Sequence, residues 1–569
     1  VMKRCIYGVD LNEMAVELAK LSLWLDSFTL GAPLSFLDHH LKWGNSLVGT
    51  DLEELYSIAY GKYDEGRMGD IFTFNLEPLR RAIRNMLFVS NISDATYQQV
   101  KESADKYKEA DNSLTGYRIL LDVILAQSFA IKEAKTFLRE RGIGIDLNNL
   151  KKSITSMAAK DRKIIEAIEA VAKEKRFFHW EIEFPEVFYE RVGDLEQKIE
   201  KKKNPGFDCV IGNPPWGAEL SLDEKNYCRT FETDTSTPNS YIYIVRQSEL
   251  LSCLKGYVGV IVPDSLLVKD YAITRHNLLN NNTLLNIIYL ERVFKDVNHD
   301  CAVIIFRHGR QDQHSFFGGI VPKNETAIET FLSPFKESYF NDAELEYRFN
   351  LNFSPINSAL YQKLCALQKI GDIGDFHEGI HTGNVREKLF HKNRLTYYDP
   401  EKIKPCLIGS NFGDEFGRYY CTPNNNWVIY DPALIDKEKE EYASLRDENI
   451  FIGPKLYVTR TGDNFYSFYD EDHYASNNLF SFKLKAEIPQ FSYFFVMAIM
   501  NSNFAQRYNR LYLAPRFGEL FTETKIIHLK LIPIPRISFT TPGEEQKKRV
   551  SEGIGLYEEY MLEFESQGV

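Results

Sequence analysis

The sequence lacks several features that would place it in a class at once. It has no uninterrupted apolar run near the length of a membrane helix and no basic-then-apolar leader at its start. Its eight cysteines are spread singly, without a C-x-x-C pair, which argues against a zinc ribbon or a disulfide framework. It has no internal repeat and no low-complexity tract. We therefore expect a protein of a reducing cytoplasm without a membrane partner.

The length and net charge narrow the classes of protein that the sequence can belong to. With 569 residues, 44% hydrophobic and 26% charged, the chain is expected to form two to four globular units. The net charge of −12 disfavours a sequence-blind nucleic-acid coat protein, because phosphate binding needs concentrated Lys and Arg. The stretch 507–549 nevertheless carries nine basic and four acidic residues, a net charge of +5. Selective DNA binding by a local basic face therefore stays possible.

The first residues predict a strand, a turn and a helix. Residues 5–10 form a short apolar strand that ends in the carboxylate of Asp10. Asn12 can cap the following helix. The apolar face of that helix is expected to hold Ala15, Leu18, Leu21 and Leu25.

The middle of the chain predicts a helical insertion followed by an alternating α/β region. Charges at helical spacing occupy residues 101–109, 117–140 and 161–176. From residue 207 on, short apolar strands (208–213, 257–262, 285–290 and 301–306) alternate with helical patterns such as 240–254. Such alternation predicts a mostly parallel sheet covered by helices, and the strand at 5–10 is expected to join it. After residue 354, short aromatic-rich strands and turns predict a separate domain, and a helix is expected over 544–565.

The sharpest local signal is the tetrapeptide Asn213-Pro214-Pro215-Trp216, directly after the strand that ends at Gly212. Two prolines force an extended, rigid turn at the carboxyl edge of the sheet, where open α/β sheets bind ligands. An amide oxygen and a backbone carbonyl can both accept from an exocyclic amine, while Trp216 offers a face for stacking a flipped base. The alternative is a structural turn whose Trp fills a gap in the core.

This motif and its surroundings resemble the DNA amino-methyltransferases that use S-adenosylmethionine, in which Asn-Pro-Pro-aromatic is the catalytic motif for adenine N6. The resemblance runs in order along the chain and includes residues 6–25, 44–47, 256–266 and 293–306. It implies a Rossmann-like methyltransferase sheet. It also implies a cofactor site containing Asp10 and Leu11, with Asp10 on the ribose hydroxyls, and Asn45 and Ser46 at the adenine.

Two further features belong to this resemblance. Phe294 matches an aromatic residue that packs on the extruded base opposite the catalytic loop, although an ordinary core Phe fits the same position. The family's Gly-rich cofactor loop is expected upstream of Asp10, and this sequence holds nothing of the kind there. The sheet is therefore expected to be truncated at its N-terminus, and cofactor binding by the sequence as given is expected to be weak or absent.

The C-terminal region resembles the target-recognition domain of Taq-type adenine methyltransferases of the gamma class, and more closely that of type IIG restriction-modification polypeptides. The segments that carry this resemblance are 373–386, 453–462, 501–504 and 531–535. The resemblance implies double-stranded DNA as partner, a prokaryotic cytoplasm, and an α+β recognition domain. Arg can bridge guanine O6 and N7 or contact a phosphate, so the candidate DNA contacts are Arg386, Lys388, Arg460 and Arg516, although each alone fits a solvated surface charge.

No metal site is expected. His377 and His381 are four residues apart, but no helix or third ligand supports metal binding. Asp122 with Glu133 and Lys135 fits the Mg²⁺-binding spacing of a nuclease only loosely and falls in a helical charged pattern. Mg²⁺ is expected only if a nuclease domain precedes this sequence.

The prediction is a site-specific DNA methyltransferase that transfers a methyl group from S-adenosylmethionine to adenine N6, within a restriction-modification or phage-defence system. An RNA methyltransferase, a protein-glutamine methyltransferase and a non-catalytic DNA-recognition scaffold are the alternatives. The predicted division of the chain is 1–52 for the first part of the methyltransferase core, 53–206 for the helical insertion, 207–350 for the second part of the core, 351–540 for target recognition and 541–569 for a terminal helix.

Overall fold

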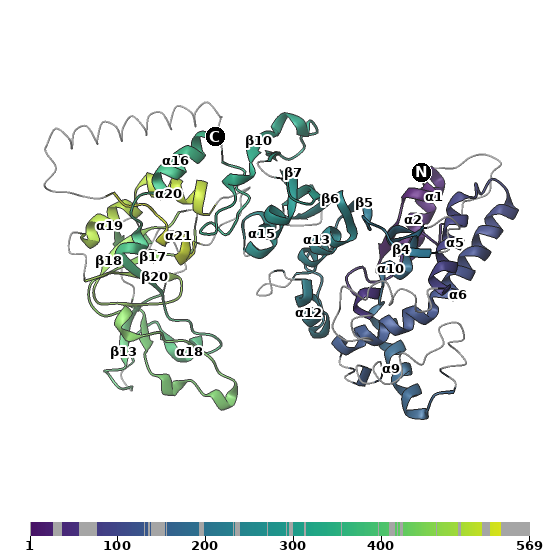
Figure 1. The fold of residues 1–569 in the computed structure, drawn as a ribbon. Helices are drawn as coiled ribbons and strands as arrows, with labels where there is room; N and C mark the ends of the chain where they lie inside the picture. Colours follow the sequence, from purple (N-terminus) through teal and green to yellow (C-terminus); the bar gives the residue numbers. More distant parts are fainter. Residues whose placement is uncertain are drawn as a thin grey trace, which may run out of the picture. The chain divides into compact units, whose positions relative to one another are not determined.

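The computed structural model divides the chain into two compact units, Val1–Phe349 and Asn350–Val569 (Figure 1). It describes residues 2–26, 37–55, 77–129, 156–192, 198–231, 239–269, 271–291, 300–311, 314–353, 355–395, 398–408, 425–462, 464–486, 491–514 and 524–535, with single residues and short pieces between them. The predicted α/β class is confirmed. The five-part division of the chain stays a prediction. In the described part, no helix is both long and apolar enough to cross a membrane.

A six-stranded sheet forms the centre of the first unit. Its order is β10 (Ser333–Lys336), β9 (Ser315–Val321), β7 (Asn282–Leu290), β8 (Cys301–His308), β6 (Ser252–Pro263) and β5 (Phe207–Gly212). Only the β5–β6 and β7–β9 pairs are parallel, whereas β6–β8, β7–β8 and β9–β10 are antiparallel. The expectation of a mostly parallel sheet is therefore wrong, because β8 returns between β6 and β7 as a hairpin-like insertion.

Helices of this region follow the strands. The helix α13 (Ser240–Leu251) packs against β5 and β6, and α15 (Ala272–Asn281) packs against β7. The other short helices are α12 (Leu222–Cys228) and α14 (Ser265–Val268). The strand β6 begins at Ser252, directly after α13, so the predicted helix 240–254 ends three residues early.

The first strand forms its own small sheet. The strands β1 (Gly8–Asp10) and β2 (Leu41–Trp43) are parallel, with Asp10 opposite Trp43. Among the described residues β1 has no ladder with β5, so the expectation that it joins the main sheet by hydrogen bonding is wrong. Side chains of both strands, Val9 and Val210, nevertheless pack against the same apolar core.

The helix α2 (Glu13–Asp26) differs from its sequence pattern. The Asn12 side chain accepts from the Met14 amide at 2.9 Å, so the predicted capping is confirmed. Val16 and Lys20 are its buried residues, whereas three of the four residues expected on the core face, Leu18, Leu21 and Leu25, are exposed. A short helix, α1 (Met2–Cys5), precedes β1.

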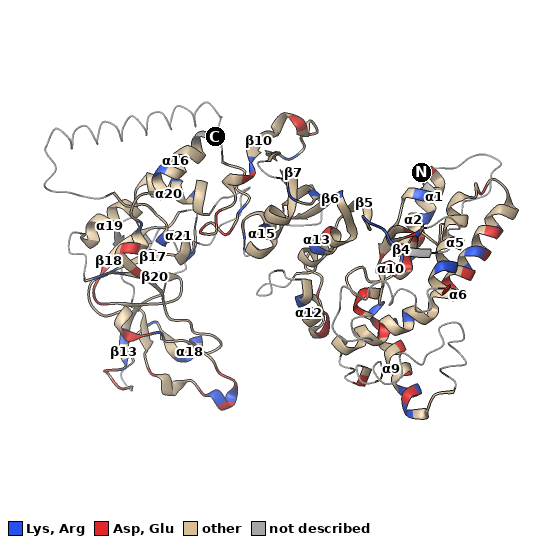
Figure 2. Cartoon of the chain, viewed as in Figure 1, with Lys and Arg blue, Asp and Glu red and all other residues tan. Residues whose placement is uncertain are grey.

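The helical part of the first unit is built around α5 (Glu77–Asn91), α6 (Tyr97–Ala126) and α9 (Ala159–Lys175), with the short α10 (Trp180–Glu183) and α11 (Pro185–Phe188). A capping box at Thr96 begins α6, which joins the helix predicted at 101–109 to the first part of the helix predicted at 117–140 and ends at Ala126. Charged residues of both signs lie along α5 and α6 (Figure 2). A hairpin of β3 (Tyr189–Val192) and β4 (Lys198–Lys201) follows α11.

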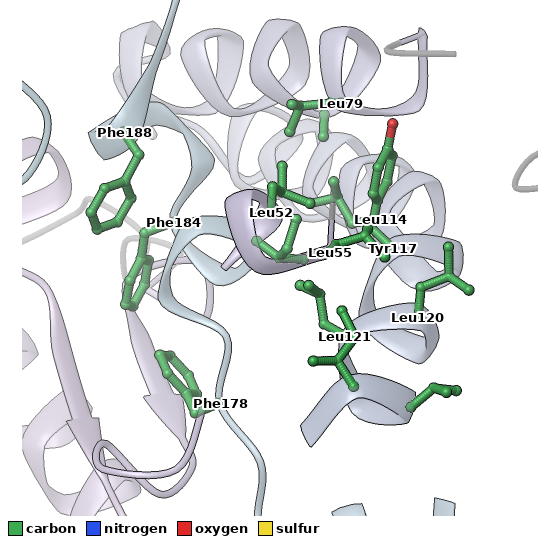
Figure 3. Packing of buried hydrophobic residues seen from close by; sticks show 14 of the residues in the cluster. Leu52, Leu55, Leu79, Leu114, Tyr117, Leu120, Leu121, Phe178, Phe184 and Phe188 are labelled. Carbon is green, nitrogen blue, oxygen red and sulfur yellow. The ribbon is translucent and has the colours of Figure 1, made fainter. Parts of the chain in front are cut away.

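One apolar core joins this helical part to the strands. Phe178, Phe184 and Phe188 belong to one apolar cluster with leucines of α5 and α6 (Figure 3). Phe207 of β5 packs against the same cluster. The region predicted as an insertion therefore shares its core with the strands that carry the candidate site.

A buried ionic cluster crosses the same boundary. Glu183 binds Lys42 of β2 at 2.8 Å and Arg118 of α6 at 2.8 Å. Burial alone would raise the pKa of the Glu183 carboxyl, but the charges of Arg118 and Lys42 hold it well below its usual range. The cluster ties the second strand to the helical part.

A second buried carboxyl predicts a pH-dependent stability. Burial raises the pKa of Glu186 to about 7, and His40 Nε2 lies 3.9 Å from its Oε1. The folded state therefore binds a proton more tightly than the unfolded state, whose pKa is about 4.3. Its contribution to stability is complete below that value and is lost as the pH rises through about 7.

Glu186→Gln is expected to raise the free energy of unfolding at pH 8 by on the order of 1–3 kcal/mol relative to the parent, because the amide carries no charge to bury. At pH 5 the gain is expected to fall to about 1 kcal/mol or less, because the carboxyl is then protonated in the folded state and ionised only in the unfolded state. Urea unfolding at both pH values measures this. An equal gain at pH 5 and pH 8 would contradict the raised pKa.

The described residues of the second unit form two four-stranded sheets. One has the order β11 (Gly374–Glu378), β20 (Leu479–Leu484), β17 (Lys455–Thr459) and β18 (Ser467–Asp470), and the other β12 (Phe390–His391), β16 (Trp427–Ile429), β13 (Ile403–Leu407) and β19 (Tyr474–Ala475). The pair β14 (Phe416–Gly417) and β15 (Tyr420–Cys421) is separate.

Short helices complete this unit: α16 (Pro355–Cys365), α17 (Ile370–Ile373), α18 (Arg386–Leu389), α19 (Tyr493–Met500), α20 (Asn503–Tyr508) and α21 (Ile526–Lys530). Strands and helices are both present, in agreement with the α+β expectation. The helix predicted over 544–565 lies outside the described residues.

Candidate active site

The Asn213–Trp216 loop leaves the sheet where β5 ends at Gly212. Asn213 is exposed and Pro214 is buried, so the first proline anchors the turn while the amide faces outward. This strand-to-loop placement agrees with the sequence interpretation.

Hydrogen bonds from the neighbouring elements fix the loop. Ser240 Oγ, at the start of α13, donates to the Pro215 carbonyl at 2.8 Å. The amide of Gly217, whose φ is +77°, donates to Asn239 Oδ1 at 3.3 Å. Trp216 Nε1 donates to the Ile261 carbonyl of β6 at 3.4 Å. The Pro215 carbonyl is therefore engaged by the protein, which leaves Asn213 and the Pro214 carbonyl as the candidate acceptors.

Trp216 and Phe294 are brought together as the sequence predicted, but not as a sandwich. Their ring centroids are 5.6 Å apart and their planes are inclined by 81°. This edge-to-face packing is the favoured arrangement of two free aromatic rings. A flat base can stack between them only after one ring turns.

The candidate cofactor residues lie at two adjacent strand ends. Asp10 is the last residue of β1, and Gly44 follows the end of β2. The Gly44 amide donates to the Asp10 carbonyl at 3.0 Å, so Asn45 and Ser46 come directly after this contact. Asp10 is exposed, and one of its oxygens accepts from the Asn12 amide at 2.7 Å.

Asn45 stabilises its own turn. Its side-chain oxygen accepts from the Leu47 amide at 3.1 Å, while Ser46 offers its carbonyl to Trp180 Nε1 at 3.1 Å. Leu11 is 59% exposed beside Asp10, and its carbonyl accepts from Trp43 Nε1 at 2.9 Å. The structure thus brings the four predicted cofactor residues to one edge of the small sheet.

The candidate DNA contacts differ in their surroundings. Arg386 and Lys388 are exposed on α18, where Figure 2 shows basic residues. Lys388 forms an ion pair of 2.5 Å with Glu441, whereas Arg386 lies 5.8 Å from the centre of the Phe390 ring. Arg386 is therefore the better placed of the two for a phosphate or a base.

Arg460 is held by its own domain. Its Nη1 lies 3.4 Å from the Asn477 carbonyl and 3.9 Å from Glu378 Oε1, and its guanidinium is 5.7 Å from the centre of the Phe480 ring. These contacts give it a structural role in the second unit. Arg516 lies outside the described residues.

Sequence reasoning missed a group of residues that contact the candidate cofactor loop. Trp180, His179 and Phe178 follow the end of α9, and Tyr227 lies on α12. The concentration of aromatic residues at 177–180 was the available signal, but it also fits an ordinary core segment.

Within the described residues no group of three or more His, Cys, Asp or Glu side chains could hold a metal ion. Asp122, the first residue of the loose nuclease spacing, is buried and its Oδ1 lies 2.9 Å from His179 Nε2. Lys135 lies outside the described residues.

Comparison with protein families distinguishes a methylase portion and a specificity portion of the chain. The model of the Eco57I restriction-modification methylase family matches residues 4–294, just over half of the chain. The model of the TaqI-like C-terminal specificity domain matches residues 410–534. The chain belongs to the Eco57I restriction-modification methylase family.

Among curated proteins, the chain is 26% identical over 579 residues to a putative type II restriction enzyme and methyltransferase of Methanocaldococcus jannaschii. The alignment covers 93% of this chain, and the chain spans 44% of the length of that relative. Solved structures that it matches include the type IIL restriction-modification enzyme MmeI in complex with DNA and the DrdV–DNA complex, each at 10% identity. Their TM-scores are 0.36 and 0.35, with 60% and 85% of this chain and 48% and 72% of theirs covered.

Proposed function

We propose that this chain carries the methyltransferase and target-recognition parts of a site-specific DNA methyltransferase that modifies adenine N6. The observation that supports this most directly is the fixed Asn213–Trp216 loop at the end of β5, with an exposed amide three residues before an aromatic ring. Family membership supports the restriction-modification setting.

The loop's chemistry suits an aromatic amine. The lone pair of such an amine is delocalised into its ring and is a poor nucleophile. Asn213 Oδ1 and the Pro214 carbonyl can each accept one amine hydrogen, which orients the nitrogen and favours a localised lone pair. The transfer would form the N–CH₃ bond and break the S–CH₃ bond of a sulfonium donor, leaving a thioether, and the amine nitrogen would lose one proton to solvent.

The residues at the ends of β1 and β2 fit S-adenosylmethionine as the methyl donor. The exposed Asp10 carboxylate can accept from two ribose hydroxyls, and Asn45 and Ser46 lie one strand away, where a base attached to that ribose would lie. Leu11 offers an exposed apolar side chain beside it. When bound, this donor supplies a methyl group already activated on a sulfonium.

A base in a duplex must leave the stack to reach the loop, which costs a few kcal/mol. We propose that the base stacks on Trp216 and that Phe294 turns away from its present edge contact to cover the second face. The second unit, with Arg386, would choose the sequence at which this happens.

The product of the complete gene should transfer labelled methyl groups from S-adenosylmethionine to unmethylated genomic DNA. RNA and a mixed protein extract serve as alternative acceptors in parallel reactions. Label confined to DNA at one short sequence supports the proposal. Label in RNA or protein alone, or in none of the three, contradicts it.

Arg386→Ala is expected to weaken duplex DNA binding by about fivefold to tenfold and to reduce the slope of log K against log salt by about 1, because a phosphate or base contact is lost. Lys388→Ala is the matched control on the same helix and should change binding less than about twofold, because Glu441 already neutralises Lys388. Fluorescence anisotropy at several salt concentrations measures both. Equal losses in the two variants would contradict the assignment of Arg386.

A further inference from the structure

Residues 176–181, between α9 and the middle of α10, lie against the loop 44–52 that follows β2. The Asn45 amide donates to the Arg176 carbonyl at 2.7 Å, and the Phe178 amide donates to the Val48 carbonyl at 2.8 Å. The two segments therefore exchange backbone hydrogen bonds in both directions, although about 130 residues separate them in the sequence.

Side chains add three bonds to these. Trp180 Nε1 donates to the Ser46 carbonyl at 3.1 Å. The Thr50 amide donates to His179 Nδ1 at 3.1 Å, and the Leu52 amide donates to Glu181 Oε2 at 3.3 Å. Every second residue of the loop from 46 to 52 is thus bound by one of the consecutive residues 178–181.

The packing of Phe178 leaves no room for a side chain at two glycines of the loop. A Cβ on Gly44 would lie 2.3 Å from Phe178 Cδ2, and one on Gly49 would lie 2.0 Å from the Phe178 carbonyl oxygen. Phe178 itself is anchored in the apolar core of the helical part (Figure 3). The loop conformation is therefore imposed by this core and not by the loop's own sequence alone.

His179 is held in one tautomer. Its Nδ1 accepts from the Thr50 amide, so Nδ1 carries no hydrogen and Nε2 donates to Asp122 Oδ1 at 2.9 Å. The imidazole is 1% exposed, and Asp122 belongs to α6. Asp122 of α6 therefore orients the imidazole of His179, and this imidazole in turn binds the loop at Thr50.

Two further contacts connect these segments to Asp10 and to the helix α12. Arg176, whose φ is +56°, places its guanidinium carbon 3.4 Å from the centre of the Trp43 ring, and Trp43 binds the Leu11 carbonyl beside Asp10. On the other side, the Tyr227 hydroxyl donates to the Gly49 carbonyl. Tyr227 belongs to α12, the first helix after the catalytic loop.

We propose that Arg176–Glu181 is a positioning segment that holds the loop 44–52 in the conformation that binds the nucleoside part of the methyl donor. The inference rests on the proposed function, because it is the proposed donor that the loop would bind. His179 and Trp180 are positioning residues: they touch the loop, and the loop touches the donor. The helical part then contributes to donor binding through the loop, whose conformation it holds.

The test compares His179→Ala with His179→Asn in the product of the complete gene. Alanine removes the acceptor for the Thr50 amide, whereas the Asn amide oxygen can occupy the place of Nδ1. If the segment positions the loop, His179→Ala should raise the KM for S-adenosylmethionine about tenfold and change kcat less than about threefold. His179→Asn should restore most of the lost affinity. Hydrogen exchange at residues 44–52 should become faster in the alanine variant and return toward the parent rate in the asparagine variant.

Trp180→Phe keeps the ring packing and removes only the donor to Ser46, so it covers the case in which His179→Ala does not fold. It should raise the same KM about threefold and accelerate exchange in the loop. Unchanged exchange in the loop, or a fall in kcat at constant KM, overturns the proposal. If the parent protein transfers no methyl group, the proposed function fails, and the exchange measurements still decide whether the segment holds the loop.

Discussion

Asn213→Ala is expected to lower kcat for methyl transfer to DNA by at least about a hundredfold while leaving duplex binding within about twofold. The side-chain oxygen is one of two acceptors that orient the amine, and removing one preorganised hydrogen-bond partner at a reacting centre typically costs a factor of 10²–10³. Asn213 is exposed at the end of β5, so its loss creates no cavity and should not affect folding.

Single-turnover kinetics with labelled methyl donor, together with DNA binding by anisotropy, measure this effect. Asn281→Ala, at the exposed end of α15, is the control and should keep the parent rate. A variant of Asn213 that retains more than a tenth of the parent kcat would show that the loop is a structural turn, the alternative that the sequence left open.

Glu183→Gln is expected to destabilise the first unit by about 3–5 kcal/mol. The substitution keeps the shape but removes the carboxylate that Lys42 and the half-buried Arg118 share, while Arg118 keeps Asp111 at 2.8 Å as a second partner. The parent's stabilisation by this carboxylate is present above pH 4 to 5 and is lost as the pH falls through its depressed pKa, because the unfolded state binds the proton more readily than the folded state does.

Urea unfolding followed by far-ultraviolet circular dichroism measures the loss at pH 7. Glu77→Gln is the matched control, since Glu77 forms a more exposed pair with Arg80 on α5 at 2.9 Å and should cost less than about 1 kcal/mol. Similar costs for the two variants would mean that the buried cluster is solvated and does not join β2 to the helical part.

The sequence predicted those features that depend on local order along the chain. The tetrapeptide at 213–216 follows a strand, as the apolar run before it indicates, and Asn12 caps α2 because a side-chain acceptor precedes the helix. The pairing of Trp216 with Phe294 came from the resemblance, since 77 residues separate them.

The features that it did not predict depend on contacts between distant segments. Periodicity does not give strand order, so the antiparallel return of β8 between β6 and β7 changed the expected sheet. The contacts of His179 and Trp180 with the loop after β2 have no local signature, because their aromatic run also fits a simple core. For α2 the sequence pattern predicted the helix correctly but not its burial, because Leu18 and Leu25 are exposed.

Nucleoside analysis of the methylated DNA tests the central claim most directly. DNA treated with the parent protein and S-adenosylmethionine is digested to nucleosides and separated by mass spectrometry beside DNA treated with Asn213→Ala. The account predicts N6-methyldeoxyadenosine as the product of the parent and none above background from the variant. A methylated cytosine, or N6-methyldeoxyadenosine at equal levels in both samples, would contradict it.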